Sequence, residues 1–508
     1  MLAKTWSATL IGIDAIKVGV EVDITGGLPG ITVVGLPDAA VQESRERVRA
    51  ALKNTGYAFP MRRIVINLSP ADLRKEGPSF DLPIAVGIMA ASEQVNPQNL
   101  AQYLFLGEVS LDGSLRPVTG VLPIAAAAKA MGLNGIVVPA DNAREAAVVE
   151  GLAVYGVKHI ADVADLLNNP DRHQPVKVDG KAELAAPQFD GLDLKDVKGQ
   201  AQARRALEIA AAGGHNLIMV GPPGSGKTML ARRMPSILPP LAFQEALEVT
   251  QIHSVAGRLR EKGALVSDRP FRSPHHSASG PSLVGGGSYP KPGEISLAHR
   301  GVLFLDELTE FKRDVLEFLR QPLEDGVVTI SRTRQSVSFP AQFMLVASTN
   351  PCPCGYYGDN IQPCTCTPRQ RDQYWAKLSG PLMDRIDLQV VVSRLKPEEI
   401  TQQSAGETSE AVRDRVQAAR TRIQERFKGE PLCSNAEMQS RHLRQWCPLS
   451  DASRQLLEGA IRKLGLSARA TDRVLKVART LADLAGEEQI QAQHIAEAAQ
   501  YRTIDRMM

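Results

Sequence analysis

The stretch NLIMVGPPGSGKTML, residues 216–230, holds the residues best suited to chemistry in this chain. An apolar run leads into a glycine-rich loop, and helix-forming residues follow. The glycines let successive backbone N–H groups turn toward a phosphate, Lys227 can reach the terminal phosphates, and the Thr228 hydroxyl can ligate Mg²⁺. The loop residues are Gly221, Pro222, Pro223, Gly224, Ser225, Gly226, Lys227 and Thr228. The order strand, loop, helix favours a nucleoside triphosphate site over a turn without function.

Two adjacent acids end a second apolar run, GVLFLDEL, at residues 301–308. At the carboxyl end of a parallel strand they would face the phosphate loop. Asp306 could then hold Mg²⁺ through water, and Glu307 could orient an attacking water. Such a pair is more often a solvated strand end, but the four preceding apolar residues and the upstream loop favour the catalytic interpretation.

A third apolar run, FMLVASTN, delivers Asn350 at its end. The amide could hold the attacking water or contact the γ-phosphate. An asparagine that merely caps a strand explains the same pattern equally well.

Four of the six cysteines crowd into CPCGYYGDNIQPCTC, as the pairs Cys352-x-Cys354 and Cys364-x-Cys366. Four thiolates on two such turns could close tetrahedrally on Zn²⁺, although C-x-C is tighter than the usual C-x-x-C. Reduced surface thiols or a redox pair remain open alternatives. Six cysteines in so long a chain do not make a disulfide framework.

These motifs need a large framework, and the chain of 508 residues is long enough for about three domains. Residues 1–168 alternate β-branched runs with helix-like runs, and residues 169–191 form a linker rich in Pro, Gly and charge. Residues 192–395 show buried apolar strands separated by helical stretches, as in a parallel sheet. Residues 396–508 become helical, and SDASRQLLEGAIRKLG predicts a helix from a cap at Ser450 or Asp451 to a stop at Gly465. That helix should place Leu456, Leu457, Ala460, Ile461 and Leu464 on one face.

The composition is that of an ordinary globular protein, with 43% hydrophobic and 23% charged residues. The net charge of +3 is too small to indicate a nucleic-acid protein by itself, so any DNA contact must be local. The N-terminus lacks a long apolar segment with a cleavage site, and no run of eighteen apolar residues occurs. We therefore expect a cytoplasmic protein that does not cross a membrane.

The motifs GPPGSGKT, LFLDE, STN, LSGPLMDRIDL and LGLSARATDRVLKVARTLADL together resemble the AAA+ ATPases of the magnesium-chelatase and minichromosome-maintenance group. With the N-terminal part included, nearly the whole chain is similar to the ComM/YifB family of magnesium-chelatase-like proteins. The resemblance implies a multidomain α/β protein: a Lon-protease-like α+β domain, a central AAA+ P-loop NTPase domain and a C-terminal helical lid. It implies ATP and Mg²⁺ as cofactors.

The same resemblance assigns four further roles. Asn350 is the sensor-one residue, and Arg385 is an arginine finger offered to the nucleotide of a neighbouring subunit. Arg469 is the sensor-two arginine, while Gly199 and Gln200 flank the adenine. A guanidinium that arrives from a neighbour couples hydrolysis to subunit packing, so a ring follows.

The stretch RKEGPSFDLP, around Ser79, resembles the nucleophile loop of a Lon-type protease. A Ser-Lys hydrolase needs a lysine with a lowered pKa within reach of its serine. Leu122 stands where the protease pattern has that lysine, and Lys129 lies roughly 10 Å further along a helix. We therefore expect a scaffold or DNA-handling platform rather than a peptidase.

Two stretches flank the acid pair. RPFRSPHHSASGPSLVGGGSYPKPGEISLAH is too rich in Gly, Pro and Ser for a helix, and in the related group this interval carries an insert that projects into the ring's pore. His275 and His276 would point apart on a strand, so we expect local hydrogen bonds from them rather than a shared ligand. GVVTISRTRQSVSFP predicts a hairpin whose turn presents Arg332 and Arg334, either to the phosphates of a DNA strand or simply to solvent.

The favoured function is a hexameric, ATP-driven DNA motor that acts on single-stranded or branched DNA. As a ComM relative it would drive branch migration of recombination intermediates in natural transformation. The ATPase subunit of a metal chelatase, remodelling a protein partner, is the alternative. A peptidase is disfavoured by Leu122, and a promoter-opening activator by an insert that does not look like the one such proteins carry.

Overall fold

The computed structural model describes residues 2–184, 191–259, 263–287, 290–332, 335–395 and 406–502, without the side chains of Arg332 and Gln335. The chain forms two compact units. Unit 1 comprises Met1–Ala186 and Ala242–Ser267, and unit 2 comprises Pro187–Leu241 and Asp268–Met508. The predicted alternation of strands and helices in the first 168 residues is confirmed.

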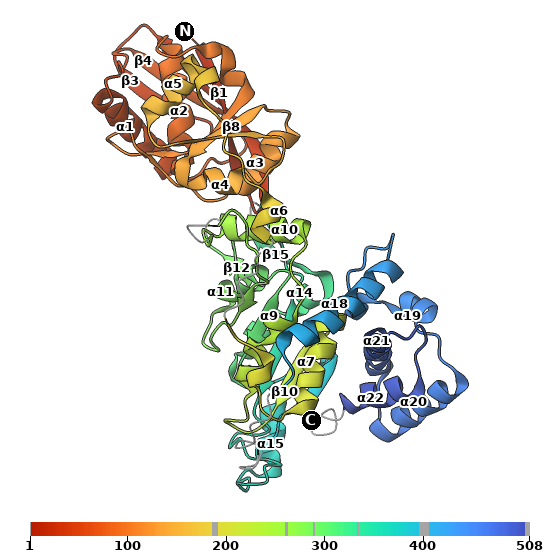
Figure 1. Ribbon diagram of the computed structural model, residues 1–508. Helices are drawn as coiled ribbons and strands as arrows, with labels where there is room; N and C mark the ends of the chain where they lie inside the picture. The colour runs from red at the N-terminus through yellow and green to blue at the C-terminus, as the bar shows by residue number, and fades with distance from the viewer. Residues whose placement is uncertain are drawn as a thin grey trace. The chain divides into compact units, whose positions relative to one another are not determined.

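Unit 1 is built on a seven-stranded mixed sheet in the order β3-β4-β2-β1-β5-β8-β9 (Figure 1). Its strands are β1 (Leu2–Ile11), β2 (Asp14–Thr25), β3 (Gly30–Val34), β4 (Arg63–Ser69), β5 (Tyr103–Phe105), β8 (Gly135–Pro139) and β9 (Ala153–Val157). A small hairpin pairs β6 (Glu108–Val109) with β7 (Leu115–Arg116). Helix α2 is buried along its whole length, because its sequence is apolar on every face. The helices of unit 1 are α1 (Ala39–Asn54), α2 (Asp81–Ala91), α3 (Val121–Ala130), α4 (Ala143–Ala146), α5 (Ile160–Asn168), α6 (Gly180–Leu184) and α10 (Phe243–Val255).

Helix α10 packs in unit 1 although its residues lie between the phosphate loop and the acid pair in the sequence. The Ser254 hydroxyl donates to the buried carboxylate of Glu145 at 2.9 Å, and the Gly120 amide donates to the Ser254 carbonyl at 3.1 Å. Ala264 and Leu265 form a buried apolar cluster with Leu122 of α3 and with Val148, which follows α4. The segment Ala242–Ser267 therefore packs in the core of unit 1, although the residues on both sides of it in the sequence belong to unit 2.

Unit 2 contains a five-stranded sheet in the order β11-β14-β17-β10-β18, and all of its strand pairs are parallel. Its strands are β11 (Phe271–Arg272), β14 (Val302–Leu305), β17 (Met344–Thr349), β10 (Leu217–Val220) and β18 (Leu388–Val391). The three central strands are buried throughout, as the apolar runs predict for a sheet covered on both faces. The predicted parallel sheet is confirmed. Its carboxyl edge brings together the loops that follow β10, β14 and β17.

Short helices surround this sheet and a helical end completes unit 2. Helix α7 (Ala201–Gly213) precedes the first strand. The helices between the strands are α8 (Lys227–Arg232), α9 (Met234–Ile237), α11 (Gly280–Val284), α12 (Glu294–Leu297), α13 (Arg313–Glu317), α14 (Arg320–Asp325), α15 (Pro368–Trp375) and α16 (Gly380–Met383). The C-terminal helices are α18 (Ser409–Arg426), α19 (Ser440–Trp446), α20 (Asp451–Leu464), α21 (Ala468–Ala485) and α22 (Ala492–Gln500). Helix α18 runs alongside α7, and α21 contacts both (Figure 1).

The predicted boundaries of α20 are confirmed. The Ser450 hydroxyl accepts a hydrogen bond from the Ser453 amide, and Gly465 ends the helix at a φ of 67°. The predicted apolar face is wrong at Leu456, which is 37% exposed. Leu457, Ile461 and Leu464 pack on the core at the spacing i, i+4, i+7, whereas Leu456 is rotated one residue away from that stripe.

The segment of residues 269–299 differs from its prediction, because it contains the helices α11 and α12. The Ser279 hydroxyl caps α11 by accepting from the Ser282 amide, and Pro281 occupies the first turn, where its missing N–H costs nothing. A strand pair, β12 (Gly285–Gly286) with β13 (Lys291–Pro292), joins the two helices. The predicted hairpin after the acid pair is confirmed as β15 (Val327–Arg332) and β16 (Gln335–Pro340).

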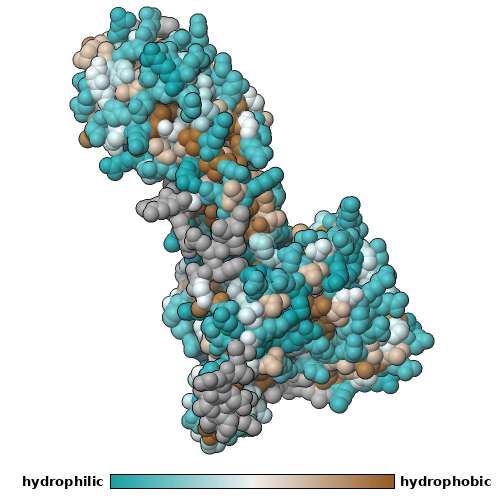
Figure 2. Space-filling model, viewed as in Figure 1, coloured by the Kyte–Doolittle hydropathy of each residue, from teal (hydrophilic) through white to brown (hydrophobic). Residues whose placement is uncertain are grey.

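Hydrophilic residues cover most of the face shown in Figure 2. Among the helices that the structure describes, none has the length and apolar character needed to cross a membrane.

Candidate nucleotide-binding and hydrolysis site

The phosphate loop connects β10 to α8 at the carboxyl edge of the unit 2 sheet. A Cβ atom on Gly221 would lie 2.1 Å from the carbonyl oxygen of Val392, so only glycine fits there. Gly224 and Gly226 have φ angles of 75° and 92°, a region that glycine enters without strain. The sequence therefore folds a tight loop directly before the first turn of a helix, where backbone N–H groups are unpaired.

Lys227 is aimed back into this loop. Its Nζ atom donates to the carbonyl oxygens of Gly221 at 2.6 Å and Pro222 at 2.9 Å, and to Oδ1 of Asn350 at 3.3 Å. The residue is only 8% exposed. Burial lowers the pKa of Lys227 to about 8, against the opposing charges of Asp306 and Glu307. The ammonium group thus lies where terminal phosphates would need it, at the cost of a weaker hold on its proton.

Asp306 is held between two hydroxyl groups at the end of β14. The Thr228 hydroxyl donates to its Oδ2 atom at 2.7 Å, and the Ser348 hydroxyl donates to its Oδ1 atom. A hydroxyl and a carboxylate side by side are the oxygen donors that Mg²⁺ prefers beside nucleotide phosphates. Ser348, on the neighbouring strand β17, was not singled out in the sequence, because its role depends on strand order.

Glu307 follows Asp306 in a left-handed conformation, with a φ of 54°. Its backbone N–H donates to Oδ1 of Asp306 at 3.1 Å, which holds this unusual turn. Its carboxylate lies 3.4 Å from Nδ1 of His276. A non-glycine residue at positive φ is uncommon and clusters at functional sites, so the turn presents a carboxylate in a fixed direction.

The expectation that the two histidines point apart is wrong, whereas the expected local hydrogen bond is confirmed for His275. The rings of His275 and His276 lie tilted against each other, with centroids 4.0 Å apart, instead of pointing away from each other. His275 contacts the Ser277 hydroxyl at 2.8 Å, while His276 faces Glu307. Sequence patterns gave no signal for this contact, because it joins a loop to the end of a distant strand.

Asn350 and the two residues assigned to the adenine lie beside the same loop. Asn350 contacts Lys227 as described above. Gln200 donates from Nε2 to the carbonyl oxygens of Ser393 at 2.6 Å and Ser225 at 3.3 Å. A Cβ atom on Gly199 would approach Cδ2 of Leu395 to 2.6 Å, so this glycine allows a close contact.

The residues present fit a nucleotide with its metal ion. The Ser225 hydroxyl is buried in the loop and is one of the side-chain oxygens in the described part of the chain that have no hydrogen-bond partner. A phosphate oxygen would supply that partner. Together with Lys227, Thr228 and Asp306, this unpaired hydroxyl supports ATP and Mg²⁺ as the group this loop holds.

Comparison with known proteins agrees with this geometry. The chain is 46% identical over 513 residues to competence protein ComM of Haemophilus influenzae, covering 100% of this chain and 98% of that protein. It is 46% identical over 511 residues to YifB of Salmonella typhimurium, with the same coverage. The chain belongs to the ComM/YifB family of magnesium-chelatase-like AAA+ proteins. Membership of this AAA+ family implies an ATPase.

Three family models match three separate parts of this chain. "Magnesium chelatase, subunit ChlI" matches residues 193–400, "Subunit ChlI of Mg-chelatase" matches residues 20–142, and "Magnesium chelatase, subunit ChlI C-terminal" matches residues 406–502. Similarity to Lon protease 2 of Bacillus subtilis is weaker, at 30% identity over 139 residues, which cover 27% of this chain and 25% of that protein.

The two arginines expected to act in catalysis lie at the other end of the strands from the chain's own phosphate loop. Arg385 stands before β18, at the amino edge of the sheet, where its carbonyl oxygen accepts from Asn216, the residue before β10. Its guanidinium pairs with Glu324 and donates to the Pro381 carbonyl. Arg469, in the first turn of α21, lies beside Asp384 at 3.4 Å. Both arginines therefore occupy the edge opposite to the nucleotide loop.

A buried ionic network fixes this amino edge to the helical end. Asp387 accepts from His215 at 3.1 Å and pairs with Arg473 of α21. Burial by itself would raise the pKa of Asp387, but the His215 hydrogen bond and the Arg473 charge hold it well below its usual range. The position of Arg469 in α21 is thus set by an anchor one helical turn further along.

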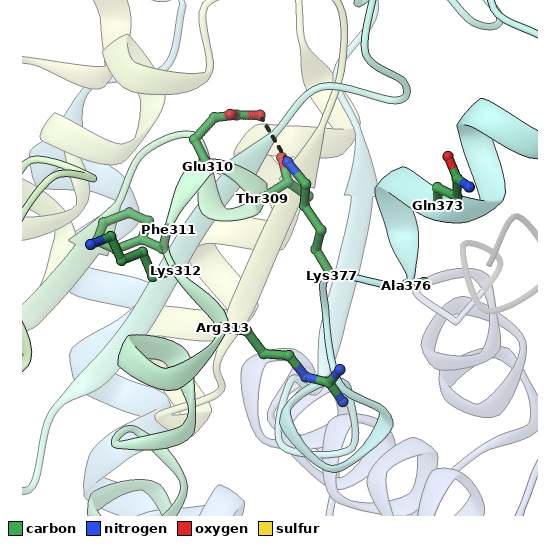
Figure 3. A pocket seen from close by; sticks show the side chains of 8 residues that line it. All are labelled: Thr309, Glu310, Phe311, Lys312, Arg313, Gln373, Ala376 and Lys377. Atoms are coloured by element: carbon green, nitrogen blue, oxygen red, sulfur yellow. Dashed lines mark ion pairs between the residues drawn. The ribbon is translucent and has the colours of Figure 1, made fainter.

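The pocket drawn in Figure 3 lies next to the acid pair but does not include the phosphate loop. Its volume is about 420 Å³. The Lys377 ammonium points toward Glu310 across this pocket, with 3.9 Å between the charged atoms, and Arg313 extends along its lower side (Figure 3). Its lining residues are Thr309, Glu310, Phe311, Lys312, Arg313, Gln373, Ala376 and Lys377. Lys312, Arg313 and Lys377 give the wall three cations against the one anion Glu310, and the lining begins two residues after Glu307.

The structure brings Cys352, Cys354, Cys364 and Cys366 together, with their sulfur atoms all within 4.8 Å of one another. The DNA-contact prediction for Arg332 and Arg334 stays a prediction, because Arg334 and the Arg332 side chain lie outside the described residues.

The expectation that the Lon-like region of unit 1 is not a peptidase concerns Ser79, Leu122 and Lys129. Ser79 lies in a short turn, Pro78–Phe80, and Leu122 is fully buried in an apolar cluster with Val148, Ala264 and Leu265. The amine of Lys129 lies beside Gly151. Lys75, a buried lysine that the sequence did not single out, donates to the carbonyl of Pro70.

Proposed function

We propose that this protein is an ATP-driven motor that acts on single-stranded or branched DNA and drives branch migration during natural transformation. The observation that carries the proposal is the AAA+ site described above in a full-length relative of a protein named for competence. Residues 192–395 would be the motor, apart from the segment Ala242–Ser267 that belongs to unit 1, and residues 396–508 would be its lid. Residues 1–168, joined by the linker 169–191, would be a non-proteolytic platform.

In the proposed cycle, Lys227 holds the terminal phosphates, Thr228 and Asp306 hold the metal ion, and Glu307 orients the attacking water. Bound Mg²⁺ supplies neutralisation of charge on the β- and γ-phosphates. Asn350 positions Lys227 and can reach the γ-phosphate. His276 restrains the carboxylate of Glu307.

The arrangement of the two arginines supports a ring, which we propose to be a hexamer. Arg385 and Arg469 share one edge of the sheet and the nucleotide loop lies at the other, so these arginines are suited to a neighbouring protomer's nucleotide. The Nε atom of Arg385 is buried without a hydrogen-bond partner, which leaves a donor for an additional acceptor. To act on a neighbour, Arg385 must exchange its contact with Glu324 for the phosphate.

The cationic pocket supports contact with the phosphates of DNA. Lys312, Arg313 and Lys377 supply positive charge and Phe311 an aromatic face, a combination that suits single strands. Because this wall follows Glu307 by only a few residues, a strand bound there would act directly on the turn that carries the catalytic carboxylate.

The test is ATP hydrolysis by the purified protein with and without single-stranded DNA at several salt concentrations. We expect stimulation that falls as salt rises, since phosphate contacts release counterions. Extension to three-strand and four-way-junction substrates measures branch migration itself. If the protein hydrolyses ATP at a rate that no DNA substrate changes, the proposed DNA motor is contradicted.

A second candidate is the ATPase subunit of a metal chelatase that remodels a protein partner. The descriptions of the three matching family models favour it. Stimulation by a chelatase partner instead of DNA would support this alternative.

A further inference from the structure

The four clustered cysteines of unit 2 have the geometry of a metal site. The sulfur of Cys352 lies 3.4 Å from that of Cys354 and 3.6 Å from that of Cys364, and Cys354 lies 3.6 Å from Cys364. Tetrahedral ligation with Zn–S bonds of about 2.3 Å places sulfur atoms about 3.8 Å apart. All four thiols are free, and their separations exceed the roughly 2.05 Å of a disulfide.

The backbone around the cluster turns toward the sulfur atoms. The Cys354 amide donates to the sulfur of Cys366, and the Cys366 amide donates to the sulfur of Cys364, both at 3.4 Å. Such N–H groups stabilise thiolates, which are the form that binds metal. Two short C-x-C turns can therefore present four ligands to one ion.

The cluster adjoins the nucleotide site. Cys352 is two residues from Asn350, and its carbonyl oxygen accepts from the Gly355 amide at 2.9 Å. A Cβ atom on Gly355 would lie 2.7 Å from Cδ of Pro223, so the cysteine turn packs directly on the phosphate loop. On its other side, Trp375 donates to the Pro351 carbonyl at 3.1 Å.

Arg394 links the same two loops from a third direction. Its guanidinium donates to the carbonyl of Pro223 at 3.4 Å and lies 3.6 Å from the carboxylate of Asp359. It also covers the ring of Tyr356, with 5.2 Å to the ring centroid. Tyr356 and Asp359 belong to the segment between the two cysteine pairs.

We propose that Cys352, Cys354, Cys364 and Cys366 bind one Zn²⁺ ion, and that this ion holds the wall of the nucleotide site formed by Gly355 and Arg394. Metal binding fixes the loop that packs on Pro223, and through it the conformation of the phosphate loop. The inference rests on nucleotide binding by that loop and is independent of DNA.

The experiment measures zinc content and nucleotide affinity of the full-length protein and four variants. The variants are Cys364→Ser, Cys366→Ser, Gly355→Ala and Cys433→Ser. Cys433 is exposed and lies outside the cluster, so its variant is the matched control. Elemental analysis gives zinc per chain, Co²⁺ substitution gives the thiolate-to-metal absorption of a tetrahedral sulfur site, and a fluorescent ADP analogue gives the dissociation constant.

We expect one zinc per chain in the parent, in Cys433→Ser and in Gly355→Ala, and loss of zinc in the two cluster variants. Nucleotide affinity should fall about tenfold in the cluster variants. In Gly355→Ala, affinity should fall while zinc is retained, because the added Cβ moves the turn without removing a ligand. Chelation of the parent's zinc and its return should lower and restore affinity, which separates the metal's effect from misfolding.

Any of three outcomes would overturn the proposal. The site is excluded if the parent protein, purified in buffers that contain zinc, holds no bound metal. It is also excluded if the purified parent has a disulfide among these cysteines. Zinc-free protein that binds the nucleotide as tightly as the parent excludes the coupling. None of these outcomes bears on whether DNA stimulates hydrolysis, so this test and that of the proposed function fail separately.

Discussion

Lys227 is buried where a phosphate-binding lysine must keep its proton. Its pKa is lowered to about 8 by burial, and bound phosphates would raise that pKa because they favour the ammonium form. Nucleotide binding thus takes up a proton once the pH exceeds the pKa of the free protein. The affinity for the nucleotide has its full value well below pH 8 and falls as the pH rises through 8.

The corresponding measurement is the dissociation constant of an ATP analogue between pH 7.5 and 9.5. We expect a loss approaching tenfold per pH unit above about pH 8. In the Lys227→Arg variant the guanidinium stays charged, so its weaker affinity should not change over this range. A parallel pH profile in parent and variant would assign the titration to another group.

His276 is a residue whose contact with Glu307 could not be predicted from the sequence. Because its ring lies 3.4 Å from the Glu307 carboxylate, we expect it to orient that group without touching the nucleotide. His276→Ala should lower kcat about tenfold, a modest part of what a positioned base contributes, and leave KM for ATP nearly unchanged. His275→Ala is the control, since the His275 ring hydrogen-bonds Ser277 while His276 is the one that faces Glu307. Equal kcat values for parent and His276→Ala would remove the assigned role.

Local motifs predicted the phosphate loop and the acid pair because the functional groups of each come from consecutive residues. The partners Ser348, His276 and Arg394 could not be predicted in the same way. Each reaches the site from another strand or loop, and only strand order and the path of the insert bring it there.

At the scale of elements, buried apolar runs predicted the parallel sheet, since a strand covered on both faces leaves no polar alternation. The placement of α10 in unit 1 was beyond prediction. Its partners Glu145 and Leu122 are far away in sequence, and a periodic apolar pattern does not specify which core it enters. The helix α20 shows the same limit, because its caps are local but the face it buries depends on its neighbours.

The Asp387 network makes a prediction about how the helical end is held. Asp387→Asn leaves Arg473 and His215 without their anion, and we expect a loss of about 3 kcal/mol in the free energy of unfolding of unit 2. Since the pKa of Asp387 is held below its ordinary value, this contribution is present above about pH 4 and is lost only as the pH falls further. The difference between parent and variant should therefore be constant from pH 5 to 8.

Urea unfolding followed by tryptophan fluorescence can measure this in a Trp6→Phe background. The two remaining tryptophans, Trp375 and Trp446, both lie in unit 2, so the signal reports that unit. An Asp387→Asn protein that unfolds at the same urea concentration as its background would show that the network contributes no net stability.

At the scale of the whole molecule, the parts of the proposed catalytic site are divided between two edges of one sheet. A single chain carries the phosphate loop at the carboxyl edge and the two arginines proposed for catalysis at the amino edge. No rearrangement of side chains alone spans the strands between them. We therefore propose that a second protomer completes the site, and that the pocket with Lys312, Arg313 and Lys377 offers a surface for DNA phosphates.

The most direct test mixes two inactive variants, Arg385→Ala and Glu307→Gln, and measures ATP hydrolysis. Each variant alone should lose about 10³-fold in kcat, whereas Arg462→Ala, at an exposed position of α20, should behave as the parent. In the mixture, some interfaces pair an intact Glu307 with an intact Arg385 of the neighbour, so activity should reappear well above the sum of the two proteins. If Arg385→Ala hydrolyses ATP as fast as the parent, or the mixture stays at the sum of its parts, hydrolysis does not depend on the neighbouring arginine.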